Sequence, residues 1–169
     1  MRYLSLVALA CFAGLCTGTI IKEVGFEDLV ASSNQIVAGH VTRSWTSWGS
    51  DHKFIWTRYE VAVDDVLAGP QNSNASSTVV VSEPGGVLDG KAMSVESAVR
   101  YTTGEHVVLF LHQFPSGDKR TVGWSQGKFT IDAGDRVQTN GARMASLNGI
   151  TYTELRQRIA ALSQRSAAK

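Results

Sequence analysis

The sequence has few of the residues that brace or anchor a protein covalently. It contains two cysteines, Cys11 and Cys16, and both fall within the first 18 residues. Prolines number only three, and no apolar run reaches the ~20 residues that a membrane-spanning helix needs. The chain after residue 18 therefore has neither a disulfide nor thiol chemistry, and we expect no membrane span.

The first 18 residues have the features of an export signal. Arg2 supplies a positive start, residues 4–15 form the apolar run, and residues 16–18 are small enough for signal peptidase. We expect cleavage near Gly18 and a periplasmic or secreted mature protein. A lipid anchor on Cys16 is the less favoured alternative, because its flanking aliphatic and small residues occur in the reverse of the lipoprotein order.

The charges balance once this segment is removed. Of 16 Lys and Arg and 15 Asp and Glu, only Arg2 is lost, which leaves 15 of each sign. A balanced surface argues against a phosphate-backbone binder, so we expect no nucleic-acid partner. Residues 19–169 have the length of one domain with a real core.

Residues 54–63 give the clearest strand pattern, with one face formed by Ile55, Thr57, Tyr59, Val61 and Val63. The alternation slips at Asp64-Asp65, which predicts a bulge that bends the strand. We expect further strands at 36–45, 78–82 and 107–111, a hairpin of 121–125 with 128–132, and another edge at Val137. Residues 87–100 fit a strand, a loop or a short helix.

Helices are expected at both ends of this β-rich region. Residues 26–30 have helical apolar spacing, and Thr151 with Glu154 has the spacing of a capping box. The second helix, 151–163, has an apolar stripe that should be buried, formed by Leu155, Ile159 and Leu162. Many short strands between two helices predict a mainly β fold with a small OB-type barrel, and a β-sandwich is the rival.

Two motifs suggest catalysis, but neither is complete. Residues 123–127 match G-x-S-x-G, yet all four histidines precede Ser125, so the order of a hydrolase triad is impossible. Residues 85–91 match most of a P-loop, but Ala92 stands where the hydroxyl residue is required. We expect no catalytic residue and no cofactor, and Ser125→Ala should leave any activity unchanged.

The histidines do not form a metal motif in the sequence. His106 and His112 share one strand face about 20 Å apart, and no carboxylate stands at ligand spacing from His40 or His52. We expect no metal site.

Three of the four tryptophans, Trp45, Trp48 and Trp56, are expected near one loop, residues 45–53. With Asp51 and His52 they are the candidate ligand-contact residues, because indoles on a loop can bind a partner protein or a sugar. The alternative is that they pack at the barrel end, and it stays open.

A family resemblance rests on five segments, residues 26–30, 34–41, 59–69, 79–86 and 101–111. Over residues 26–113 their order resembles the netrin-like (NTR) barrel, the OB-type fold of the N-terminal domain of tissue inhibitors of metalloproteinases. The chain also looks like uncharacterised secreted bacterial proteins that continue with a Gln-Gly-Lys-Phe hairpin, here residues 126–129. This resemblance implies a netrin-like barrel.

The resemblance does not imply inhibition. The inhibitors chelate the protease zinc through an N-terminal cysteine and hold the barrel with disulfides, and a chain beginning near Thr19 has neither. We expect an exported, non-catalytic binding module for a secreted or envelope protein, a peptide or a glycan. The alternatives are a structural envelope protein, a protease inhibitor or protease-associated domain, and a hydrolase using Ser125.

Overall fold

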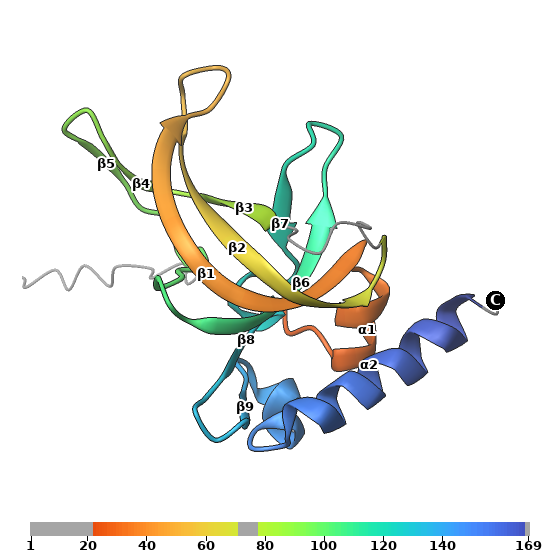
Figure 1. Cartoon of the computed structure of the whole chain (residues 1–169). Helices are drawn as coiled ribbons and strands as arrows, with labels where there is room; N and C mark the ends of the chain where they lie inside the picture. Colours follow the sequence, from red (N-terminus) through yellow and green to blue (C-terminus); the bar gives the residue numbers. More distant parts are fainter. Residues whose placement is uncertain (1–21, 71–77, 168–169) are drawn as a thin grey trace, which may run out of the picture.

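The computed structural model describes residues 22–70 and 78–167, so the predicted signal segment lies outside the described residues. Figure 1 shows a curved sheet with helices below it. The elements are α1 (Phe26–Ala31), β1 (Gln35–Trp48), β2 (Ile55–Ala68), β3 (Thr78–Pro84), β4 (Gly86–Leu88), β5 (Lys91–Met93), β6 (His106–Gln113), β7 (Lys119–Thr121), the 3₁₀ helix η1 (Trp124–Gly127), β8 (Lys128–Ile131), β9 (Val137–Gln138), the 3₁₀ helix η2 (Ala142–Leu147) and α2 (Tyr152–Ala167).

Seven strands form one sheet in the order β1-β2-β3-β7-β6-β8-β9, and β1 also pairs with β6. The sheet therefore curls back on itself, although β3 and β7 meet through a single pair, Val81 with Lys119. This is a barrel-like sheet rather than a sandwich of two sheets. The predicted mainly β, barrel-like fold with a helix at each end is confirmed.

The long hairpin of β1 and β2 bends where its register shifts. One shift skips Asp64, between the partners of Ala38 and Gly39, and this confirms the predicted bulge. The backbones of β1 and β2 come very close here, because a Cβ added at Gly39 would collide with the carbonyl oxygen of Ala62. Only glycine leaves room for that approach.

Strand β6 lies at the centre and is buried on both faces. Val107, Leu109 and Leu111 belong to the cluster inside the curl of the sheet. Val108 and Phe110 face the other way, into a second cluster shared with the helices. Burial on both faces explains the unbroken apolar run that predicts this strand.

The C-terminal helix forms as its sequence predicts. The Thr151 hydroxyl accepts a hydrogen bond from the backbone N–H of Glu154, at 3.1 Å. Leu155 and Ile159 are fully buried and Leu162 packs partly against the same cluster. The Glu154 carboxylate pairs with Arg158 instead of completing the capping box, and the helix continues to Ala167, beyond the predicted end at 163.

One predicted supersecondary element is wrong. Residues 121–125 and 128–132 do not form a hairpin, because η1 separates β7 from β8 and both strands pair with β6. Residues 87–100, left open above, begin with the small β4–β5 hairpin. Among the described residues, no helix is both long enough and apolar enough to cross a membrane.

Candidate functional site

The predicted contact residues are divided between two faces of the β1–β2 hairpin. Strand β1 runs to Trp48, so Trp45 and Trp48 lie in the strand and not in a loop, which corrects the predicted loop 45–53. Trp45 pairs with Arg58 and Trp48 with Ile55. Trp45 and Trp48 are three positions apart in the strand, so their side chains point to opposite faces of the hairpin. The two indoles therefore cannot form one surface.

Trp48 packs on the small β4–β5 hairpin. Its indole Nε1 donates a hydrogen bond to the Asp89 carboxylate at 2.9 Å, and the Lys91 ammonium lies 5.4 Å from the ring centroid. His52 is also near, with its ring centroid 6.4 Å from that of the indole. Trp48 and His52 therefore belong to a packing contact at the end of the hairpin.

Trp56 enters a different arrangement, around Arg120 of β7. The Arg120 guanidinium lies 4.2 Å from the Trp56 ring centroid and 4.4 Å from that of Phe114. Its Nε is buried and, within the described residues, has no hydrogen-bond partner. Two aromatic rings thus hold a cation whose hydrogen-bonding capacity is not used up.

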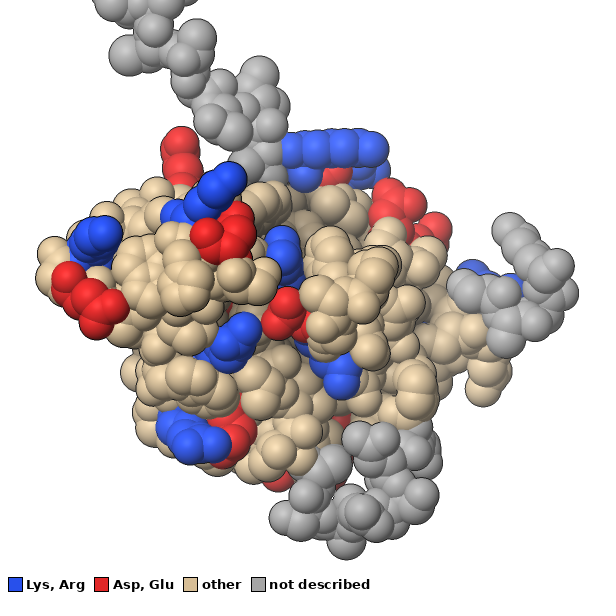
Figure 2. All heavy atoms as spheres, turned by 90° about the horizontal axis from the view of Figure 1, so that it is seen from above, with Lys and Arg blue, Asp and Glu red and all other residues tan. Residues whose placement is uncertain are grey.

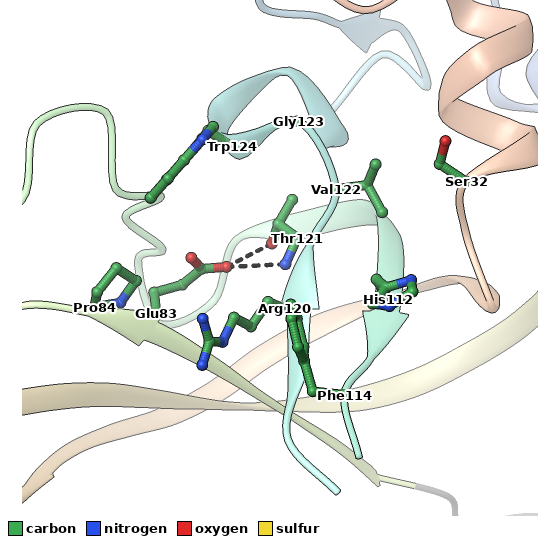
Figure 3. A pocket seen from close by; sticks show the side chains of 10 residues that line it. All are labelled: Ser32, Glu83, Pro84, His112, Phe114, Arg120, Thr121, Val122, Gly123 and Trp124. Carbon is green, nitrogen blue, oxygen red and sulfur yellow. Dashed lines mark hydrogen bonds between the residues drawn. The ribbon is translucent and has the colours of Figure 1, made fainter. Parts of the chain in front are cut away.

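Arg120 lies between two hollows. The first, which we call the Trp124 hollow, has a volume of about 330 Å³ (Figure 3). Its lining is mostly apolar and includes Pro84, Phe114, Val122 and Trp124. The second, the Asp51 hollow, has a volume of about 490 Å³ and is lined by Gly49, Ser50, Asp51, Phe54, Trp56, Arg58, Ser116, Asp118 and Arg120.

The cations of the Asp51 hollow differ in their partners. Arg58 lies 3.7 Å from the Asp118 carboxylate and donates a hydrogen bond to Ser47. Arg120 has no carboxylate at ion-pair distance among the described residues. It is therefore the cation of this hollow that can bind an added anionic group.

A buried carboxyl lies at the base of the Trp124 hollow. Glu83 accepts hydrogen bonds from the backbone N–H and the hydroxyl of Thr121, at 3.2 and 2.7 Å (Figure 3). Burial raises the pKa of Glu83 to about 7, although these hydrogen bonds and the Arg120 charge oppose the shift. The hydroxyl of Tyr101 is hydrogen-bonded to that of Thr121. The base of the hollow is thus neutral or anionic according to pH.

Ser125 does not lie in a nucleophile elbow. It belongs to the 3₁₀ helix η1 rather than to a strand-to-helix turn. No histidine or carboxylate is hydrogen-bonded to its hydroxyl within the part of the chain that the structure describes. Its neighbour Trp124 is 41% exposed at the rim of the hollow.

The histidine interpretation needs a correction. Asp64, at the bulge of β2, places a carboxylate oxygen 2.8 Å from Nδ1 of His40 and 3.9 Å from Nε2 of His106. The expectation that no carboxylate lies at ligand spacing from His40 was based only on spacing along the chain. Strand pairing brings the three side chains together.

Arg120 and Phe114 were missed by the sequence analysis. The β6–β7 pairing places Arg120 opposite His112, and Phe114 follows His112 by two positions on the same face. A prediction of this pairing would therefore have brought Arg120 and Phe114 together. Predicting it would have required a hairpin at residues 112–120 in place of one at 121–132. Of the five predicted contact residues, Asp51 and Trp56 line the Asp51 hollow.

Comparison with known proteins gives no family for the chain: no protein-family model matches it, and no curated protein matches it.

Proposed function

We propose that this protein is an exported, non-catalytic binding module whose contact surface is formed by the two hollows on either side of Arg120. The observation that favours this surface is the Arg120 guanidinium, which packs on Trp56 and Phe114 and has no carboxylate at ion-pair distance among the described residues. A cation kept in place by two rings loses little side-chain entropy when a ligand binds it, which favours affinity.

The geometry favours a ligand that bears a carboxylate. Because its Nε is buried, the guanidinium has its two terminal nitrogens left for binding, and these match a carboxylate in two parallel hydrogen bonds. Beside it, the apolar lining of the Trp124 hollow suits an aliphatic or aromatic side chain. A peptide segment of a partner protein offers both groups close together.

The alternative functions would depend on other features of the molecule. A glycan would stack on exposed Trp124, which supplies one ring for the purpose. A structural envelope protein would need no hollow, and a protease inhibitor or protease-associated domain is suggested by family resemblance only. Figure 2 shows acidic and basic side chains interspersed on the face seen from above, which suits a neutral or mixed partner better than a nucleic acid.

Peptide selection tests this proposal. A phage-displayed random library is panned on the full chain, and enriched peptides are synthesised and titrated by calorimetry. We expect the enriched peptides to share an acidic group next to an apolar residue. Arg120→Met should weaken their binding about tenfold or more, because a charge-assisted hydrogen bond contributes ~1.5–3 kcal/mol.

Arg43→Met is the matched control, because Arg43 also lies over an indole, that of Trp45, but lines neither hollow. Equal affinity of Arg120→Met and the wild type would place the contact surface elsewhere. Mass spectrometry of the peptides after incubation tests the non-catalytic part, and a cleaved peptide would contradict it.

A further inference from the structure

A second cluster of functional side chains lies away from both hollows, on β1, β2 and β6. We propose that His40, Asp64 and His106 form a binding site for a divalent transition-metal ion of the Zn²⁺ type. This site is independent of the proposed peptide surface, because none of the three residues lines either hollow.

The backbone brings the three residues together from separate strands. The β1–β6 pairing places His40 directly opposite His106. Asp64 is the residue that the β1–β2 register skips at the bulge, and a bulge turns a side chain away from the regular alternation. The site is therefore built on the central strands of the sheet and not on a loop.

The ligand atoms already lie close to a common point. Nδ1 of His40 and Nε2 of His106 are 2.8 and 3.9 Å from the same oxygen of Asp64, and all three ligand atoms lie within 4.8 Å of one another. A tetrahedral ion with bonds of ~2.0–2.1 Å separates its ligand atoms by about 3.4 Å. Side-chain shifts of about 1 Å would therefore bring the three onto one ion.

Partial exposure of the side chains leaves room for those shifts. The two imidazole rings are stacked, with centroids 4.2 Å apart and planes 9° from parallel, so one of them must tilt to share an ion. The His40 and Asp64 side chains are 50% and 52% exposed, and that of His106 is 29% exposed. Solvent on one side gives the rings room to rotate and gives an ion a path of entry.

The donor set selects the kind of ion. Two imidazole nitrogens and one carboxylate oxygen suit zinc and its neighbours, whereas Mg²⁺ and Ca²⁺ prefer oxygen ligands alone.

Such an ion would join three strands at once. It would bind the folded chain and not the unfolded one, so it would stabilise the native sheet by mass action. Three protein ligands leave a fourth position for water or for a group on a partner.

Calorimetry with Zn²⁺ alone, in a buffer that does not chelate it, tests the site on the full chain. We expect one ion per chain, and about a tenfold or greater loss of affinity in each of His40→Ala, His106→Ala and Asp64→Asn. His112→Ala is the control, because it removes a histidine of the same strand outside the cluster and should leave the affinity unchanged. At a hundredfold excess over the dissociation constant, Zn²⁺ should raise the Tm of the wild type by about 5 °C or more.

Circular dichroism shows whether each variant keeps the fold. We expect the variants to fold, because the three substituted side chains are partly exposed. Zinc binding that is equal in His106→Ala and the wild type would overturn the proposal and assign the ion to other groups, such as the thiols of Cys11 and Cys16. Binding lost in the histidine variants but unchanged in Asp64→Asn would overturn the three-ligand assignment. A Co²⁺ complex without the strong visible absorption of tetrahedral coordination would also contradict it.

Discussion

Glu83 and Thr121 are hydrogen-bonded across the thinnest junction of the sheet. Strands β3 and β7 meet through one pair of residues, Val81 and Lys119. The Glu83 carboxylate adds two hydrogen bonds over this junction, from the hydroxyl of Thr121 at 2.7 Å and from its backbone N–H at 3.2 Å. The junction of β3 and β7 therefore depends in part on a buried titratable group.

This relationship makes the stability of the protein depend on pH. The pKa of Glu83 is about 7 in the folded chain against an ordinary value of 4.5, so between these values the unfolded chain loses the proton and the folded chain keeps it. The free energy of unfolding therefore falls as pH rises from about 4.5 to about 7. Below this window ionisation of Glu83 costs no stability, and above it the destabilisation is complete, on the order of 3 kcal/mol.

Glu83→Gln should remove this dependence, because the amide oxygen can accept the same two hydrogen bonds without a charge. We expect the variant to match the wild type near pH 4 and to exceed its stability at pH 8 by up to about 3 kcal/mol. Urea unfolding at a series of pH values measures the difference. Glu96→Gln, at an exposed position, is the control, and a constant difference between Glu83→Gln and the wild type from pH 4 to 8 would contradict the prediction.

The bend of the β1–β2 hairpin gives a second prediction. Gly39→Ala should destabilise the protein by about 3 kcal/mol or more, because its methyl group would meet the backbone carbonyl of Ala62 and the side chain of Val61. Gly25→Ala is the control, since its methyl group meets the side chains of Asp28 and Arg143 at ordinary contact distance. Denaturant midpoints measure both, and an equal loss in the two variants would contradict the close approach at the bulge.

Local patterns were enough to predict the elements whose burial is decided along the chain. The apolar run of 107–111 predicted a strand, which the structure shows buried on both faces, and the phase slip at Asp64 predicted the bulge. Thr151 predicted the start of α2 through its cap. Each of these signals lies within a few residues of the feature that it predicts.

The features that depend on strand pairing could not be predicted in the same way. His40 and His106 are adjacent because β1 pairs with β6, and residues far apart in the sequence show no sign of that pairing in composition or spacing. The expected hairpin at 121–132 failed for the same reason, since both of its segments pair with the central strand β6 instead. The candidate sites lie where strands distant in the sequence meet. Of the residues that form these sites, the sequence therefore indicated only Trp56 and Asp51.

The last prediction separates the two tryptophans that the sequence grouped together. Trp48→Phe keeps a ring in the packing contact but loses the hydrogen bond to Asp89, so it should cost about 1 kcal/mol of stability and leave peptide affinity unchanged. Trp56→Ala removes one of the two rings that hold Arg120, so it should weaken the selected peptides about tenfold or more.

Thermal unfolding and peptide titration on the same two variants make the test. Arg120→Met in the Trp56→Ala background should add little further loss of affinity, because the indole acts through the guanidinium that it positions. Full peptide affinity in Trp56→Ala, or an equal loss of affinity in Trp48→Phe, would contradict the assignment of binding to the Arg120 face. The second result would return the contact surface to the end of the hairpin, where Trp48 packs against β4 and β5.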